Sequence, residues 1–331
     1  MDFRQSDAPR STSPRFGSDL APDSQVHFLS RRAFLKGAGA FVLSQVAFPR
    51  LLAGRELCKD VKPLRLGFLT DCHAMAERGA PDSLDRAADL MNGLQPELII
   101  GGGDFVHGGF GTWTGTMDLR WKIADRFLKK LHSRMEPMIG NHDFYNPVSR
   151  TGAINPGNPH RRFLQQFGLK RTYRSFVFKG YKFLLLDSIR VIGGSEMYDG
   201  WVSSEQLAWL EAELAATPPS QPLVLCSHIP LKSGISSFLE GAVRGASART
   251  WVANASEVIS RLEDRPVVMV LQGHVHLDER LSLGGIPCIT GGAVCGKWWR
   301  GSNLGTNPGL GLIEIQPGSS PNWHYHDTPS A

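Results

Sequence analysis

Five short apolar runs, each followed at once by side chains that can bind metal ions, constrain the fold of this chain more than any other feature. The runs are LRLGFLT (64–70), ELII (97–100), MEPMIG (135–140), LVLCS (223–227) and VVMVLQ (267–272). Their length and apolar content predict buried strands, and helical patterns separate the first three. This alternation predicts a layered α/β domain.

The segments between and after these runs predict helices and antiparallel strands. Helices are expected at 82–94, 116–132, 203–217 and near 254–263, two strands around a Lys179-Gly180 turn within 172–188, a hairpin near 279–291, and a last strand at 310–315. Antiparallel pairs beside parallel strands predict a mixed sheet. Because no internal repeat or low-complexity linker follows residue 62, we predict one domain over residues 62–331.

Polar side chains that can bind metals stand at the end of each apolar run. Asp71 and His73 follow the first run, Asp104 the second, Asn141, His142 and Asp143 the third, His228 the fourth, and His274 and His276 the fifth. Ligands of α/β sheets gather beyond the carboxyl ends of the strands, so these groups are expected to converge. In Asp71-x-His73 and His274-x-His276, an extended chain would point both side chains to one side.

The types of donor atom in this set indicate the metal chemistry. Oxygen and nitrogen donors without thiolates favour Zn²⁺, Mn²⁺ or iron over a sulfur cluster. The candidate ligands are Asp71, His73, Asp104, Asn141, His228, His274 and His276, which are more than one ion needs beside a substrate. A carboxylate shared by two ions about 3.5–4 Å apart would divide them, as in two-metal hydrolytic sites. We therefore predict two divalent or trivalent ions of Mn, Fe or Zn.

The same motifs give the chain a specific family resemblance. It resembles the calcineurin-like metallophosphoesterases, whose motifs D-x-H, G-D, G-N-H-D/E, H and G-H-x-H occur here in order. They are DCH (71–73), GD (103–104), GNHD (140–143), SH (227–228) and GHVH (273–276). The resemblance extends from about residue 64 into the last third of the chain. It implies a four-layer α/β/β/α sandwich of two mixed β-sheets flanked by helices.

The resemblance also implies how the ligands divide and what they do. The first metal would be held by Asp71, His73, Asp104 and His276, and the second by Asp104, Asn141, His228 and His274. Asp104 would then bridge the two ions. The implied activity is hydrolysis of phosphate esters by a hydroxide that bridges the metals. His142 would stabilise the developing charge or protonate the leaving group, with Asp143 as its orienting partner.

The motifs do not decide which phosphate ester is the substrate. GNHD and the order of helices and strands favour small organic phosphodiesters of the cyclic-nucleotide or glycerophosphodiester type. A phosphomonoesterase similar to acid phosphatases is the alternative, because it would share the same ligands. A non-enzymatic alternative is an exported protein that binds a phosphorylated ligand without turnover. The loops 105–118, 144–160 and 188–202 are expected to set the choice of substrate.

The glycine-rich stretch GGGDFVHGG (101–109) has two possible interpretations. A dinucleotide-binding loop would need glycine at position 106, where Val106 stands, so we expect glycines that permit close approach of the backbone to the metal cluster. His107 is a candidate substrate contact. Trp298 and Arg300, in CGKWWRG (295–301), are two more, although the tryptophan pair could equally seal a hydrophobic patch.

The N-terminal region, residues 1–53, is expected to lie outside the fold. Ser30-Arg31-Arg32 and the apolar run from Gly37 to Phe48 resemble a twin-arginine export signal, with the export machinery as a partner and a periplasmic or extracellular destination. The apolar run is too short for an ordinary membrane span, so no stable span is expected after removal of the signal. This region holds +3 of the net charge of +5, so the charge of the domain does not indicate a nucleic-acid partner.

The five cysteines of the chain indicate neither a zinc ribbon nor a disulfide scaffold, because no C-x-x-C is present. Pairing of Cys288 with Cys295 stays open. Cys72 lies between two predicted ligands and is expected to pack in the core.

Overall fold

The first β-sheet has five strands in the order β13-β12-β1-β2-β3 in a computed structural model that describes residues 60–149, 151–235 and 247–329. These strands are β1 (Leu64–Leu69), β2 (Leu98–Gly101), β3 (Met135–Pro137), β12 (Gly309–Ile315) and β13 (Asn322–Asp327). β1, β2 and β3 run parallel, whereas β12 pairs antiparallel with both β1 and β13. The predicted export signal lies outside the described residues.

The second sheet has six strands in the order β10-β11-β9-β8-β5-β4. Its strands are β4 (Arg174–Phe178), β5 (Tyr181–Leu185), β8 (Leu223–Ser227), β9 (Val267–Gln272), β10 (Glu279–Leu283) and β11 (Ile286–Thr290). β5, β8, β9 and β11 are parallel, and the predicted hairpins β4–β5 and β10–β11 add an antiparallel strand at each edge. The expectation of mixed sheets is therefore confirmed.

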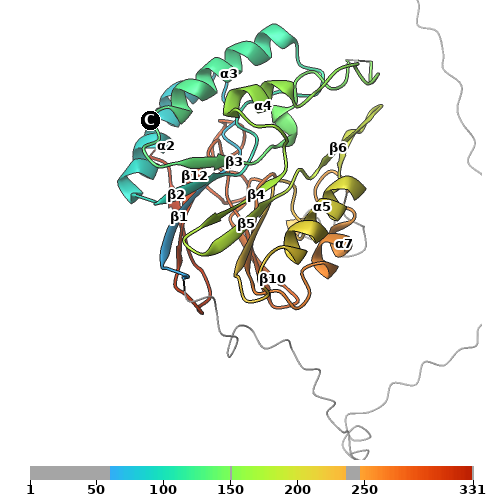
Figure 1. The fold of residues 1–331 in the computed structure, drawn as a ribbon. Coiled ribbons are helices and arrows are strands. Elements are labelled where there is room, and N and C mark those ends of the chain that lie inside the picture. Colours follow the sequence, from blue (N-terminus) through green and yellow to red (C-terminus); the bar gives the residue numbers. More distant parts are fainter. Residues whose placement is uncertain (1–59, 150, 236–246, 330–331) are drawn as a thin grey trace, which may run out of the picture. The chain divides into compact units, whose positions relative to one another are not determined.

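The two sheets face each other across a hydrophobic core, with helices outside. Leu66, Phe68 and Ile100 of the first sheet belong to one buried cluster with Phe183 and Met269 of the second. The helices are α2 (Ala80–Leu94), α3 (Thr114–Leu128), α4 (Arg161–Phe167), α5 (Ser204–Ala215) and α7 (Ala255–Ser260). Figure 1 shows α2 and α3 on the side of the first sheet and α5 and α7 on the side of the second. This is the expected α/β/β/α arrangement.

The structure departs from the sequence-based expectations in a few elements. α3 ends at Leu128 rather than near residue 132, because the next amides bond three residues back, as Lys130 N–H does to the Phe127 carbonyl at 3.0 Å. β3 ends at Pro137. The hairpin of β6 (Ile189–Gly193) and β7 (Met197–Gly200), and the short helix α4, were not predicted. The β6–β7 hairpin lies within the loop expected to choose the substrate.

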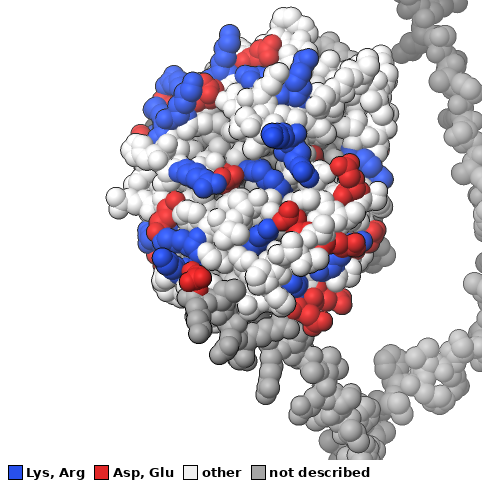
Figure 2. Space-filling view, in the orientation of Figure 1, with Lys and Arg blue, Asp and Glu red and all other residues white. Residues whose placement is uncertain are grey.

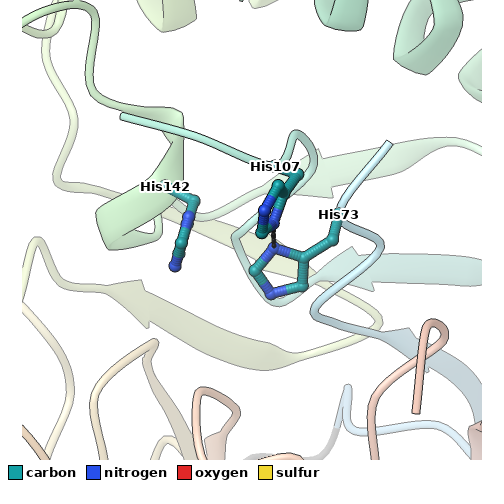
Figure 3. A group of neighbouring side chains, drawn as sticks. All are labelled: His73, His107 and His142. Carbon is teal, nitrogen blue, oxygen red and sulfur yellow. Dashed lines mark hydrogen bonds between the residues drawn. The ribbon is translucent and has the colours of Figure 1, made fainter. Parts of the chain in front are cut away.

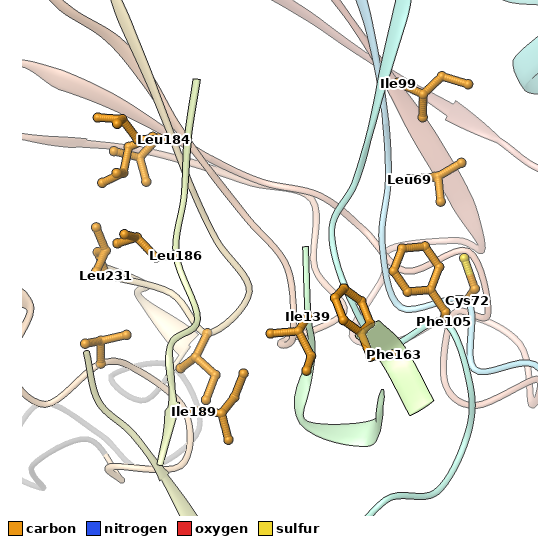
Figure 4. Close-up of a cluster of buried hydrophobic side chains, with 14 of the residues drawn as sticks. Leu69, Cys72, Ile99, Phe105, Ile139, Phe163, Leu184, Leu186, Ile189 and Leu231 are labelled. Atoms are coloured by element: carbon orange, nitrogen blue, oxygen red, sulfur yellow. The ribbon is translucent and has the colours of Figure 1, made fainter. Parts of the chain in front are cut away.

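The described cysteines are buried free thiols, so Cys288 and Cys295 are not paired. Cys72 packs in the core beside Leu69 and Phe105, as Figure 4 shows, which confirms its expected packing role.

The surface of the domain mixes both signs of charge. On the face in Figure 2, Lys and Arg side chains lie beside Asp and Glu side chains. Within the described ranges, no helix combines the length and the apolar character that crossing a membrane requires.

Candidate metal centre

The predicted ligands converge where the carboxyl ends of β1, β2, β8 and β9 and the turn after β3 meet. Asp71, His73 and Asp104 form one group whose possible ligand atoms lie within 4.8 Å of one another, and Asp104, His228 and His274 form another. All of these residues are buried except His274, which is half-buried. The structure thus brings together side chains from both sheets, and Asp104 belongs to both groups.

The ligand-bearing turns have unusual backbone conformations. Five of the seven predicted ligands have left-handed φ angles: Asp71 (54°), His73 (41°), Asp104 (54°), His274 (73°) and His276 (56°). Non-glycine residues rarely adopt this region, and clusters of them mark functional sites. The prediction of extended D-x-H and H-x-H segments is therefore wrong. The paired side chains converge through left-handed turns and not through strand alternation.

Glycines permit the close contact between these turns. Gly103 has a φ of 93°, and a Cβ atom there would lie 2.7 Å from both the Gly140 amide nitrogen and His228 Nδ1. A Cβ atom on Gly140 would overlap the Asp104 carboxylate. The expectation that the glycines of the stretch 101–109 serve close approach is confirmed at Gly103.

In the first group, His276 Nε2 lies 3.2 Å from Asp71 Oδ1 and 3.1 Å from His73 Nε2. His73 Nε2 also lies 3.6 Å from Asp104 Oδ2. Four donor atoms thus face one small volume.

In the second group, Asp104 Oδ2 lies 3.3 Å from His228 Nε2, which is 3.2 Å from Asn141 Oδ1. The His274 ring centroid lies 5.2 Å from that of His228. The same oxygen of Asp104 therefore faces His73 on one side and His228 on the other.

Backbone carbonyls fix which imidazole nitrogens are free to bind a metal. Nδ1 of His228 donates to the Gly102 carbonyl at 2.7 Å, and Nδ1 of His276 donates to the Gly296 carbonyl at 2.6 Å. His274 uses Nε2 instead, which donates to the Arg249 carbonyl at 2.7 Å. The other nitrogen of each ring then presents its lone pair to the cluster.

Asp71 gives a further test of whether the site fits a cation. Its Oδ2 accepts from Thr70 Oγ1 at 2.7 Å and from the His274 amide at 2.9 Å. Its Oδ1 is buried, has no hydrogen-bond partner among the described residues, and faces the imidazole nitrogens. Lone pairs of oxygen and nitrogen that face one another inside a protein are costly to bury unless a proton or a metal ion lies between them. The donor set therefore fits metal ions.

The pKa shifts have the same electrostatic origin. Burial opposes a charge on His228, but the carboxylates of Asp104 and Asp71 together with the Gly102 carbonyl outweigh it and raise the pKa of His228 to about 9. The pKa of His276 is likewise raised, against burial, by Asp71. Burial raises the pKa values of Asp71 and Asp104, but the combined attraction of the surrounding histidines, led by His276 and His228 respectively, lowers both below their usual range. The cluster favours ionised carboxylates beside a cation.

His142 lies beside the cluster but is held differently from the prediction. Its amide donates to Asp104 Oδ1 at 2.7 Å, and its Nδ1 accepts from the Gly108 amide at 3.1 Å. Nε2 is then the protonated nitrogen. Burial lowers the pKa of His142 to about 3, so the ring is neutral.

The prediction that Asp143 orients His142 is wrong. The Asp143 carboxylate accepts backbone amides of Asp104 (2.8 Å), Phe105 (2.8 Å), Val106 (3.3 Å) and Gly140 (2.9 Å). A buried carboxylate that satisfies several amides fixes the loop on which they lie. Asp143 therefore holds the Asp104 turn against the turn that follows β3.

His107 lies beside both His73 and His142 and does not line the cavity described next. Its Nδ1 lies 3.4 Å from His73 Nδ1, and its ring stacks on that of His142 with centroids 5.5 Å apart. Figure 3 shows the three rings together. Arg120 donates to the His107 carbonyl at 2.5 Å. The structure thus places His107 to support its neighbours.

A cavity of about 500 Å³ opens over the cluster. Its lining includes Asp104, His142, His274, His276, Tyr198, Arg249, Trp298, Asn303 and Leu304. Trp298, a predicted substrate contact, lies against His276 with ring centroids 4.9 Å apart. Arg300 is exposed and does not line the cavity. Trp299 points away and donates from Nε1 to the His73 carbonyl at 2.9 Å.

Three residues that line the cavity were not predicted from the sequence: Tyr198, Arg249 and Asn303. Tyr198 lies on the unpredicted strand β7, and none of the three belongs to a recognisable motif. A signal existed only for Tyr198, which lies in the predicted substrate loop 188–202.

Comparison with known proteins agrees with this geometry. Residues 64–278 match the calcineurin-like phosphoesterase family. The 3′,5′-cyclic adenosine monophosphate phosphodiesterase CpdA of Escherichia coli strain K12 is 31% identical over 245 residues, which cover 70% of this chain and 76% of that protein. A cAMP/cGMP dual specificity phosphodiesterase of Mycobacterium tuberculosis is 24% identical over 224 residues, which cover 66% of this chain and 62% of that protein.

A solved structure supports the fold separately. A dimetal phosphatase from Danio rerio superimposes with a TM-score of 0.57 at 15% identity, covering 78% of this chain and 98% of that one. At this identity the likeness concerns the fold alone. The family match and the similarity to CpdA establish that the chain belongs to the calcineurin-like phosphoesterase family and is a hydrolase of phosphoesters.

Proposed function

We propose that this protein is a phosphodiesterase of small organic phosphodiesters, of which cyclic nucleotides are one class, and that it uses two metal ions bridged by Asp104. The observation that carries the proposal is the single Asp104 oxygen that faces His73 at 3.6 Å and His228 at 3.3 Å. The similar proteins named as cyclic-nucleotide phosphodiesterases support the choice of diesters.

The assignment of ligands follows the two groups. Asp71, His73, Asp104 and His276 would hold one ion, and Asp104, Asn141, His228 and His274 the other. When bound, the ions would supply activation of water and neutralisation of phosphate charge. Mn, Fe or Zn suits these oxygen and nitrogen donors.

The side chains of the protein perform the remaining steps. His142 carries its proton on Nε2, because Nδ1 accepts from Gly108, and it lines the cavity. It can therefore donate a hydrogen bond to a phosphoryl oxygen or to the departing alkoxide. Asp143 keeps the Asp104 turn in place, and His107 supports the rings of His73 and His142. Trp298 offers a flat apolar wall to an organic ester group.

A substrate panel tests the proposed activity. Metal-replete protein should cleave bis(p-nitrophenyl) phosphate with a higher kcat/KM than p-nitrophenyl phosphate, because the cavity leaves room for two ester groups. Release of p-nitrophenolate measures both rates. A higher kcat/KM on the monoester would overturn the diester assignment and leave a phosphomonoesterase.

Replacement of His142 by alanine tests the role of its imidazole. We expect kcat of His142→Ala to fall at least about 100-fold, the usual contribution of a positioned proton donor, while metal content stays that of the wild type. His132→Ala, which removes an exposed histidine, is the matched control. Steady-state kinetics with metal analysis would contradict the role if the metal-replete His142→Ala protein kept wild-type kcat.

Export also belongs to the proposal. The Ser30-Arg31-Arg32 sequence before an apolar run supports a twin-arginine route to the periplasm or the exterior. Replacement of both Arg31 and Arg32 by lysine should keep the protein in the cytoplasmic fraction. Equal amounts of wild type and variant in the periplasmic fraction would refute this route.

A further inference from the structure

The cavity over the metal cluster has two chemically different ends. One end is apolar and adjoins the imidazoles of the first group. The Trp298 ring lies 4.9 Å from the His276 ring and 6.4 Å from the His73 ring. Leu304 adds an exposed apolar side chain beside Asn303, whose side-chain amide donates to the carbonyls of Val275 and His276.

The opposite end is polar and cationic and adjoins the second group. Tyr198 faces His274 edge-on, with ring centroids 6.4 Å apart. The Arg249 guanidinium carbon lies 4.9 Å from the centroid of the Tyr198 ring. Ser247 and Thr250 complete this part of the wall. The metal cluster therefore lies between an aromatic wall and an arginine.

The backbone holds Arg249 firmly at this place. Gly200 at the end of β7 donates to the Ala248 carbonyl at 2.5 Å and accepts from the Ala253 amide at 2.8 Å. The carbonyl of Arg249 itself accepts from His274 Nε2 at 2.7 Å. Because the carbonyl of Arg249 bonds a predicted metal ligand, its backbone has a fixed position relative to the cluster, and the side chain extends from there over the Tyr198 ring.

The charge of Arg249 has no carboxylate partner within the part of the chain that the structure describes, and its side chain is exposed. Two other arginines near the cluster bond to carbonyls instead, Arg78 to Trp298 and Arg120 to His107. Neither of these lines the cavity. Among the arginines that the structure describes near the cluster, Arg249 is therefore the one whose charge can face an ester in the cavity.

We propose that Arg249, supported by Tyr198, selects phosphodiesters in which the ester group opposite Trp298 bears a second anionic group, such as a carboxylate or a phosphate. The inference rests on the proposed phosphodiesterase function. The phosphoryl group would lie beside the candidate metal ligands, with one ester group along Trp298 and Leu304 and the other within reach of the guanidinium. Arginine suits this task because its fork of N–H donors matches a planar or tetrahedral anion.

Binding of non-hydrolysable phosphinates tests the selection without turnover. Benzyl(2-carboxyethyl)phosphinate and benzyl(3-methylbutyl)phosphinate match in size and differ in one charge. Titration calorimetry on metal-replete wild-type protein should give about tenfold tighter binding of the carboxylate, the size expected for one charged hydrogen bond. Arg249→Ala should remove the difference. A third probe, benzyl(2-aminoethyl)phosphinate, carries a positive charge at the same place. Arg249→Glu should bind this probe more tightly than the carboxylate probe.

Three controls separate this role from general effects. Metal content of each variant shows whether the cluster is intact. Arg300→Ala removes a nearby exposed cation outside the cavity and should keep the tenfold ratio. Trp298→Ala should weaken both probes alike and also keep the ratio.

The outcomes also separate this inference from the proposed function. Equal binding of both probes to the wild type, or a preference that survives Arg249→Ala, would overturn the role of Arg249 alone. If neither phosphinate binds the metal-replete protein, the result would instead count against the phosphodiesterase site itself.

Discussion

The carboxylate of Asp104 is the constraint on which the rest of the site depends. Its Oδ2 faces His73 on a turn of the first sheet and His228 at the end of a strand of the second, while its Oδ1 accepts the His142 amide. One side chain therefore joins the two sheets, both groups of candidate ligands and the proposed proton donor. The Asp143 carboxylate, through its bonds to the Asp104 and Gly140 amides, holds the turn that carries this side chain.

The local backbone is unfavourable in the absence of a cation. Each left-handed ligand residue costs about 1 kcal/mol or more, and the buried Asp71 Oδ1 lacks a hydrogen-bond partner. Asp143 offsets part of this cost through its bonds to backbone amides, and carbonyls orient the rings of His228 and His276. A ligand that binds only the folded chain offsets the remainder, so bound metal is expected to stabilise the domain.

The sequence predicted the strands and the convergence of ligands because hydrophobic period and strand-end chemistry are local signals. The two facing sheets were expected from the family resemblance and not from these signals. It could not predict the left-handed turns, which result from contacts between Asp71, Asp104 and residues far away in the chain. For the same reason it misassigned Asp143, whose partners lie on another loop. Arg249 escaped notice because its place depends on the bonds of its neighbours Ala248 and Ala253 to Gly200, which no motif reveals.

The most direct test of the account is the metal content of Asp104→Asn beside that of His276→Ala. Wild-type protein should contain two metal ions per chain by elemental analysis. His276→Ala should lose about one, because it removes a ligand of one group, whereas Asp104→Asn should lose most of both. Full retention of two ions by Asp104→Asn, or loss of only one, would contradict the central place of this carboxylate.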